Sequence, residues 1–308
     1  MKIIVSIVLL GCALLLAPWQ RSSDAPSAEL EFGVATFNIR YGTADDGNNS
    51  WPNRRDLCIG VLQALDADIV GVQEALDFQL DEMREMLPGY VQIGVGRDDG
   101  ARRGEHTALL VRTDRFAIDR SGTAWLSDTP NVPGSKSWGN SITRIVTWAR
   151  LIDLRSGRGV WVYNAHLDHQ SQASRERSAE EISQLIHERT FADEPVIVMG
   201  DFNAGEGNSA CRYMRGEVDS ASGRDDAPDS PRLIDTFRAQ HPDASEVGTF
   251  NGFKDERRGE KIDHIFAGPG LRVLGAGIDR TRGDGGQCPS DHDAVWAKMA
   301  FDGHEPGE

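Results

Sequence analysis

The sequence predicts an α/β protein with two stacked β-sheets and helices on their outer faces. Apolar stretches with the length and alternation of β-strands recur from residue 31 onward. Segments with helical spacing separate some of these stretches, and the two kinds of segment are mixed along the chain rather than grouped in blocks. Neither an internal repeat nor a long low-complexity tract interrupts this pattern. We therefore expect one domain over residues 31–303, preceded by a leader and linker over residues 1–30.

The individual elements follow from the spacing of apolar residues. Helices are predicted where apolar side chains recur three or four positions apart, and the second helix should stop before Pro88. The predicted helices span residues 54–65, 76–86 and 174–190. The predicted strands span residues 32–39, 68–72, 91–95, 107–111, 116–119, 143–152, 160–167, 196–199, 261–267, 271–278 and 294–301. The strands 143–152 and 160–167 should pair as a hairpin, and the polar loop 220–231 should be mobile.

The N-terminus has the pattern of a targeting segment. Met1 and Lys2 are followed by fifteen apolar or small residues up to Ala17, a run that is short for a membrane span. The stretch "LLGC" ending at Cys12 is similar to a bacterial lipobox, but apolar residues continue after the cysteine and no clean signal-peptidase site follows. A lipoprotein, an ordinary cleaved signal and an uncleaved anchor remain open. We expect a periplasmic, extracellular or membrane-anchored protein that meets the membrane only through this leader.

The net charge limits the classes of partner. The chain carries a formal charge of −15 and has a pI near 5.0, so its surface repels a nucleic-acid backbone unless a local patch opposes the repulsion. General nucleic-acid binding is therefore disfavoured. A small phosphorylated substrate in a focused cleft is still compatible with this charge.

Three cysteines follow the leader, at positions 58, 211 and 288. Their number is odd and their spacing is not that of a metal site. Three unpaired thiols are the simpler expectation, and a disulfide between Cys211 and Cys288 is the alternative in an oxidising compartment.

Polar side chains follow several of the predicted strands. In "PVIVMGDFNA" an apolar strand ends in Asp201 and Asn203, which should share a face because side chains alternate along a strand. The same spacing relates Asn164 and His166. If such strand ends converge, they form one cleft lined by carboxylates, amides and imidazoles, from Asn38, Glu74, His166, Asp201, Asn203, Asp263, Asp291 and His292. Hard carboxylate oxygens favour Mg²⁺, with Mn²⁺ or Ca²⁺ as alternatives, over zinc.

Each of these residues also has an ordinary structural explanation. An Asp-x-Asn sequence is usually an Asx turn or a helix cap, and a glutamate at a strand end is usually exposed to solvent. A single histidine such as His166 is usually a surface or core residue. The occurrence of five such strand ends in one chain favours a functional site.

Six motifs in a fixed order carry a resemblance to a known family. The motifs "TFNIR", "GVQEA", "NAHLDH", "GDFNA", "KIDHIF" and "SDHDAV" resemble those of the endonuclease/exonuclease/phosphatase superfamily, over roughly residues 32–301. The resemblance implies a four-layer α/β sandwich and a metal-dependent hydrolase of phosphate esters. It also implies that Glu74 is the principal metal ligand and that Asn38 and Asp291 lie close to the ion.

The resemblance further implies five catalytic residues. Asp201 would orient or deprotonate the attacking water, and Asn203 would hold a phosphate oxygen. His166 would form a hydrogen bond to the phosphate or to the leaving oxygen. His292 would stabilise the charge that develops on phosphorus, and Asp263 would fix its tautomer.

Four further residues are predicted to bind substrate. Arg144 lies on a strand next to the loop that carries Trp138, and its guanidinium could clamp a phosphate with two hydrogen bonds. A surface salt bridge is the alternative role for Arg144. Arg40, directly after the "TFNI" strand, and Asn164 complete the set.

Fold alone does not select a substrate within this superfamily. The negative charge favours a small, sugar-linked or lipid-linked phosphate ester. The alternative enzyme is an extracellular nuclease. An inactive binding protein is a third hypothesis, which the presence of Glu74, Asp201 and His292 disfavours.

Overall fold

Two six-stranded β-sheets stack face to face in the computed structural model, which describes residues 30–254 and 256–302. In the first sheet the spatial order is β11-β12-β1-β2-β4-β3, and in the second it is β5-β6-β7-β8-β10-β9. The first sheet consists of β1 (Glu31–Asn38), β2 (Ile69–Ala75), β3 (Tyr90–Ile93), β4 (His106–Arg112), β11 (Leu271–Ile278) and β12 (Val295–Phe301). The second consists of β5 (Phe116–Trp125), β6 (Ile145–Asp153), β7 (Gly159–His166), β8 (Val196–Asp201), β9 (Ile234–Asp235) and β10 (Asp263–Ala267).

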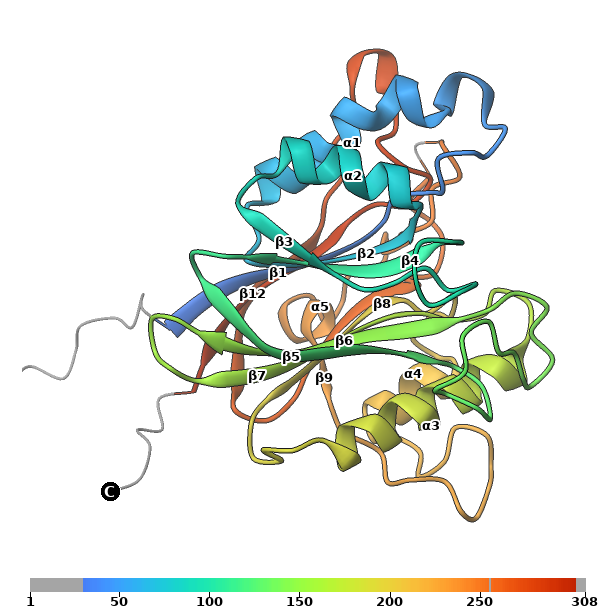
Figure 1. Cartoon of the computed structure of the whole chain (residues 1–308), viewed down its shortest axis with the longest axis vertical. Helices are drawn as coiled ribbons and strands as arrows, with labels where there is room; N and C mark the ends of the chain where they lie inside the picture. The colour runs from blue at the N-terminus through green and yellow to red at the C-terminus, as the bar shows by residue number, and fades with distance from the viewer. Residues whose placement is uncertain (1–29, 255, 303–308) are drawn as a thin grey trace, which may run out of the picture.

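Helices cover the outer face of each sheet and complete four layers (Figure 1). The helices α1 (Trp51–Leu65) and α2 (Asp77–Met86) lie on the first sheet, whereas α3 (Gln172–Glu188) and α4 (Ser209–Met214) lie on the second. A short helix, α5 (Thr236–Gln240), packs against β10 and β11, and two 3₁₀ turns, η2 (Gly47–Asn49) and η3 (Asp284–Gly286), lie in loops. The predicted four-layer α/β sandwich is confirmed.

Three apolar clusters hold these layers together. The central cluster fills the space between the sheets with side chains such as Ile69, Val162 and Met299. The other two clusters join each sheet to its own helices. Each fully buried aliphatic side chain of this kind contributes about 1.5–3 kcal/mol of transfer free energy.

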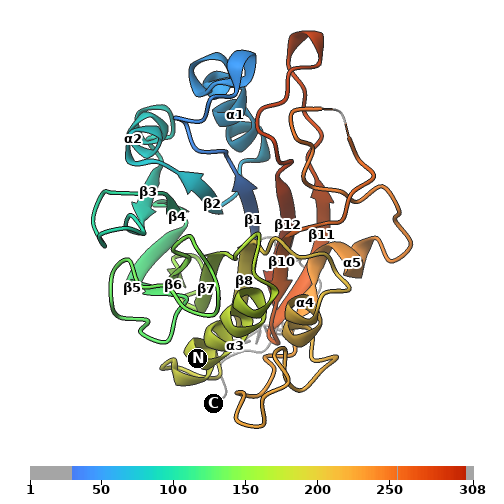
Figure 2. The same ribbon diagram turned by 90° about the vertical axis from the view of Figure 1, so that its right-hand side faces the viewer.

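The strand directions bring the predicted polar residues to one end of the sandwich. In the first sheet β1 runs parallel to β2, and in the second β7 runs parallel to β8 (Figure 2). Parallel neighbours end at the same edge of a sheet. His166 is paired in register with Asp201, and Asp201 with Asp263 on the antiparallel strand β10. These three side chains therefore stand in one row at the sheet edge.

All predicted helices and strands are present, with differences at their ends. Helix α1 begins three residues earlier than expected because Pro52 is tolerated in the first turn of a helix. Strand β5 continues to Trp125 instead of ending at residue 119, because a bulge between Ile118 and Arg120 breaks its alternation. The short elements α4, β9 and α5 were not expected, since segments of six residues or fewer carry almost no periodicity.

The structure bears on the expectations for one loop and for the cysteines. In the loop 220–231, Ser222 Oγ donates to the buried Glu180 and the carbonyl of Pro228 accepts from Tyr213 OH, and the mobility of the loop stays a prediction. Cys58, Cys211 and Cys288 are all buried, and no disulfide joins Cys211 to Cys288, so that alternative is wrong.

The predicted leader (1–30) lies outside the described residues except for Leu30, as does residue 303 at the far end of the predicted domain. Within residues 30–254 and 256–302, none of the helices has both the length and the apolar character needed to cross a membrane.

Candidate active site

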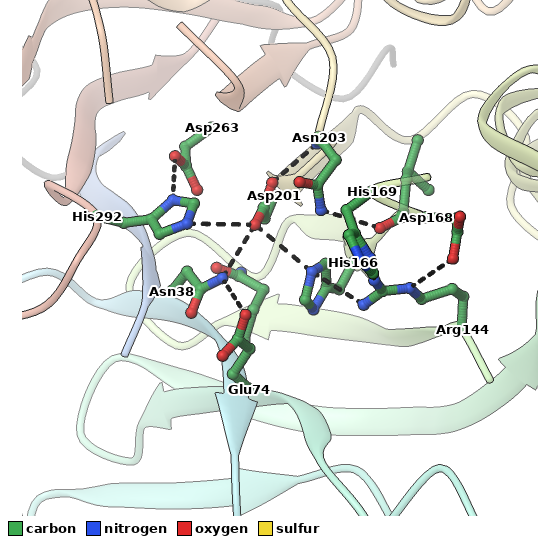
Figure 3. Close-up of polar contacts among 12 residues, drawn as sticks. Asn38, Glu74, Arg144, His166, Asp168, His169, Asp201, Asn203, Asp263 and His292 are labelled. Atoms are coloured by element: carbon green, nitrogen blue, oxygen red, sulfur yellow. Dashed lines mark hydrogen bonds and ion pairs between the residues drawn. The ribbon is translucent and has the colours of Figure 1, made fainter. Parts of the chain in front are cut away.

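A cavity of about 440 Å³ opens at the edge of the sandwich where β1, β2, β7 and β8 end. Eight residues predicted from the sequence line it: Arg40, Glu74, Arg144, His166, Asp201, Asn203, Asp291 and His292. Figure 3 shows the carboxylate of Asp201 in contact with the side chains of His166 and His292, with the side chain of Asn38 and with the backbone N–H of Asn203. The predicted convergence of strand ends is therefore confirmed by the geometry.

The turn after β8 presents Asp201 and Asn203. Gly200 has φ +139°, and a Cβ there would lie 1.9 Å from the carbonyl oxygen of Ala165, so only glycine fits. Asp201 is the last residue of β8, and its Oδ1 accepts a hydrogen bond of 2.8 Å from the backbone N–H of Asn203. Asn203 then takes a left-handed conformation with φ +47°. Asn203 thus reaches the cavity through an Asx turn and not through strand alternation, so the predicted location is right and its stated cause is wrong.

The second oxygen of Asp201 lies at the centre of the polar network. Its Oδ2 accepts a hydrogen bond of 2.9 Å from Asn38 Nδ2, and it lies 3.5 Å from His166 Nε2 and 3.8 Å from His292 Nε2. Burial raises the pKa of Asp201 to about 7, and the nearby carboxylate of Asp263 adds to the effect. A carboxylate of this kind can accept a proton near neutral pH.

His292 lies between two carboxylates. Its Nδ1 donates a hydrogen bond of 2.8 Å to Asp263 Oδ2. Burial alone would lower the pKa of His292, but the carboxylates of Asp263 and Asp201 outweigh burial and raise that pKa well above its usual range. Asp263 is fully buried, and its Oδ1 accepts no hydrogen bond from any described residue. The hydrogen bond to Asp263 thus holds His292 in one orientation, and the two carboxylates favour its protonated form, the imidazolium.

Arg144 and His166 form the opposite wall. The Arg144 side chain is buried, and its guanidinium lies 3.0 Å from His166 Nε2, 2.9 Å from His169 Nδ1 and 3.4 Å from Asp168 Oδ2. Because a guanidinium can only donate, both imidazoles accept through these nitrogens. Burial lowers the pKa of His166 well below its usual range, and the charge of Arg144 acts in the same direction. Arg144 is therefore the positive group of this wall and His166 is neutral. Because Arg144 is buried, the alternative of a surface residue is wrong, although its guanidinium does form an ion pair with Asp168.

Glu74 and Asp291 form an acidic corner of the cavity. Glu74 has φ +60° within a bulge of β2, which turns its side chain out of the strand and toward the cavity. The guanidinium of Arg40 lies between the two carboxylates, with Nη1 4.0 Å from Glu74 Oε2 and Nε 3.7 Å from Asp291 Oδ2. Burial raises the pKa of Asp291. This corner therefore already attracts positive charge.

Asn38 links this corner to Asp201. Its Nδ2 donates to Glu74 Oε1 at 3.1 Å and to Asp201 Oδ2 at 2.9 Å. Its Oδ1 accepts from the backbone N–H of Arg40 at 3.0 Å, which fixes the orientation of the amide. Asn38 thus holds the carboxylates of Glu74 and Asp201 close together.

The described residues fit a divalent metal ion. Ligand atoms of Asp201, Asp263 and His292 lie within 4.8 Å of one another, the one such group among the residues that the structure describes. His292 already donates a hydrogen bond to Asp263 within this group. The positive charge of its imidazolium offsets the negative charge of the two carboxylates in part. The pair Glu74 and Asp291 offers the hard carboxylate oxygens that a divalent cation prefers, and a cation there would take the place of the Arg40 guanidinium.

Two predicted substrate contacts are contradicted by the structure. Asn164 is fully buried between the sheets, where its Nδ2 donates to the carbonyls of Val72 and Ala108 at 3.1 and 2.8 Å. It joins the two sheets two residues below the cavity. Trp138 does not line the cavity, because its Nε1 donates to Asp128 and its ring packs on Arg177.

Several residues that line the cavity were not selected from the sequence. Tyr41, Arg97, Glu105, Ile142, His169, Phe250 and Ile262 complete the lining. His169 lies inside the motif "NAHLDH" and could have been selected there. Phe250 lies in a loop without periodicity, so no local pattern marks it. Its exposed ring lies 5.2 Å, between centroids, from that of His292.

The stacked sheets and the cleft at their edge define the class of this protein: an enzyme that hydrolyses phosphate esters. A sequence model described as "Endonuclease/Exonuclease/phosphatase family" matches residues 35–292, and the chain belongs to this family, whose members depend on metal ions.

Proteins similar to this chain include two of solved structure and one viral protein. A mannosyl-6-phosphatase from Bacteroides thetaiotaomicron is 33% identical, with 88% of this chain and 100% of that chain covered and a TM-score of 0.75. An endonuclease/exonuclease/phosphatase from Bacteroides vulgatus is 31% identical, with coverage of 88% and 99% and a TM-score of 0.77. An uncharacterised protein of Acanthamoeba polyphaga mimivirus is 26% identical over 263 residues, which cover 83% of this chain and 90% of that protein.

Proposed function

We propose that this protein is an exported, Mg²⁺-dependent phosphoesterase that hydrolyses a small sugar-linked phosphate ester. The observation that carries the proposal is the position of the Asp201 carboxylate. This carboxylate lies between the imidazolium of His292 and the amide of Asn38. The same amide also donates a hydrogen bond to Glu74. The 33% identity to a mannosyl-6-phosphatase favours a sugar phosphate over the lipid-linked esters that the charge also allows.

In this proposal the residues of the chain have separate roles in hydrolysis. Asp201 accepts a proton from the attacking water, while Arg144 and the amide of Asn203 bind non-bridging phosphate oxygens. His292 stabilises the charge of the transition state and donates its own proton to the leaving alkoxide. The carboxylate of Asp263 keeps His292 protonated until that step. A cation held by Glu74 and Asp291 would act as a Lewis acid when bound, and Mn²⁺ or Ca²⁺ could replace Mg²⁺ at oxygen ligands.

A panel of phosphate esters tests the proposed function. Mannose 6-phosphate, nitrophenyl phosphate, bis-nitrophenyl phosphate, sphingomyelin, plasmid DNA and RNA would each be incubated with the protein in Mg²⁺ and in chelator. We expect chelator-sensitive release of phosphate from the sugar ester and intact DNA and RNA. Rapid nicking of the plasmid with no turnover of the sugar ester would contradict the proposal in favour of the nuclease. No turnover with any ester would favour the inactive binding protein.

Phe250 is expected to bind the alcohol part of the substrate. Half of its surface is exposed at the cavity, and the apolar face of a sugar ring could cover it. Phe250→Ala should raise KM for mannose 6-phosphate about tenfold with little change in kcat, as expected for the loss of roughly 1.4 kcal/mol of apolar contact. Phe191→Ala, an equally exposed ring outside the cavity, is the control. An unchanged KM in Phe250→Ala would exclude this contact.

Glu74→Gln should weaken metal binding. The substitution keeps the shape of the side chain but removes the charge that a divalent cation requires. The Mg²⁺ concentration for half-maximal activity should rise by at least about tenfold. Glu82→Gln, whose carboxylate accepts from Trp51 outside the cavity, should leave the titration unchanged. A normal Mg²⁺ titration of Glu74→Gln would move the ion to another site.

The apolar run up to Ala17 supports export. The exported protein would be a lipoprotein, a protein with a cleaved signal, or a protein with an uncleaved anchor. Cell fractionation together with the mass of the mature N-terminus tests it. A cytoplasmic protein that retains Met1 would contradict export.

A further inference from the structure

Arg54, in the first turn of α1, is a buried cation with an unusual set of partners. Its side chain is fully buried, and all four of its hydrogen bonds to described residues go to backbone carbonyl oxygens. Nη1 donates to Ile39 at 2.7 Å and to Pro289 at 3.1 Å, Nη2 donates to Arg40 at 3.1 Å, and Nε donates to Asn49 at 2.8 Å. The guanidinium therefore connects loops that are distant in sequence.

Two of these loops carry Asn38 and Asp291, which border the cavity's acidic corner. Ile39 and Arg40 directly follow Asn38, and Pro289 lies two residues before Asp291. A second contact joins the same two loops, because Ser290 Oγ donates to the carbonyl oxygen of Asn38 at 2.7 Å. The Arg54 guanidinium and the Ser290 hydroxyl thus both join the loop after Asn38 to the loop before Asp291, in addition to the contact of Arg40 Nε with Asp291 Oδ2 at 3.7 Å.

A structural role alone does not explain an arginine here. Burying a charge without an ion pair is costly, and a helix that only needs to pack could use an aliphatic residue. The planar fork of a guanidinium, in contrast, can reach several carbonyl oxygens in fixed directions. Rings of Trp51 and Phe253 lie near the guanidinium, at 5.1 and 5.5 Å from its central carbon, and limit its movement.

We propose that Arg54 is a positioning residue for the metal site. It holds the loops that carry Asn38 and Asp291 at the separation that a cation between Glu74 and Asp291 needs. Partners behind the ligands of a metal ion commonly set its affinity in this way. The inference rests on the metal site of the proposed function.

Calorimetric titration of the full chain with Mg²⁺ and with Mn²⁺ tests this inference. Arg54→Lys keeps the charge but cannot reach all four carbonyl oxygens, and its Kd for either ion should rise about tenfold. At saturating metal its kcat should approach that of the wild type. Arg55→Lys, on the next residue with an exposed ion pair to Asp56, is the matched control and should bind normally.

The possible outcomes separate the inference from the proposed function. A lower Tm of Arg54→Lys with an unchanged Kd would overturn the inference and leave only a structural role. If the wild type bound neither ion, both the inference and the metal-dependent function would be overturned. If Arg54→Lys did not fold, Ser290→Ala would take its place, because it removes the second contact at little cost in packing. A several-fold higher Kd in Ser290→Ala would support the inference, and an unchanged Kd would overturn it.

Discussion

Asp201→Asn is expected to lower kcat about a thousandfold, which lies within the usual range for the loss of a general base. The amide cannot accept the proton of water, and its Nδ2 would face the donor Nδ2 of Asn38. KM should change much less, since the phosphate contacts of Arg144 remain. The measurement is steady-state release of phosphate from mannose 6-phosphate at saturating Mg²⁺.

A matched control for this substitution is Asp153→Asn. Asp153 is as deeply buried as Asp201, but it pairs with Arg115 near the β6–β7 turn, outside the cavity. This variant should lose stability and keep kcat. Equal losses of kcat in the two variants would assign the effect to unfolding rather than to chemistry.

The pH profile of the wild type follows from the same carboxylate. A base must be ionised to act, and burial together with Asp263 raises the pKa of Asp201 to about 7. Activity should therefore fall as the pH is lowered through this region, and a bound cation would move the fall to lower pH. Asp201→Asn should lack this acidic limb. An identical limb in both proteins would assign it to another group.

His292→Gln is the second substitution with a large expected effect. It removes the imidazolium that stabilises the transition state and protonates the leaving oxygen, so kcat should fall by about two to three powers of ten. His241→Gln is the control, because that ring contacts the carbonyl of Ala276 away from the cavity. Full activity of His292→Gln would show that catalysis does not depend on the imidazolium of His292.

Asp263→Asn tests how His292 is kept protonated. The carboxylates of Asp263 and Asp201 raise the pKa of His292, so an acid role for His292 should persist to high pH in the wild type. Removing the charge of Asp263 should move the alkaline limb of the kcat profile to lower pH. A purely structural role of Asp263 would lower stability and leave that limb in place.

The sequence was informative where a regular strand ends in a polar side chain. Glu74, His166 and Asp201 belong to strands, so the pattern of apolar residues predicts both the strand and the edge at which they lie. The direction of a side chain at such an edge is less predictable. Asn164 has the expected alternation with His166, but it lies two residues further from the cavity. There its side chain joins the two sheets.

Loops and distant contacts were the least predictable part of the site. Phe250 and Arg97 reach the cavity from irregular segments, and no spacing rule applies to them. Trp138 is in such a segment too, and its contact with Asp128 directs it away from the cavity. The partners of Arg54 are separated from it by up to 235 residues, so only the folded chain shows what this arginine connects.

The most direct test of the central claim is the rate of phosphate release from mannose 6-phosphate by the wild type and by Asp201→Asn, each with Mg²⁺ and with chelator. We expect the wild-type rate to disappear in chelator, to return when Mg²⁺ is added back, and to be about a thousandfold lower in Asp201→Asn. A wild-type rate that chelator does not change, or an Asp201→Asn rate equal to that of the wild type, would contradict metal-dependent hydrolysis with Asp201 as the base.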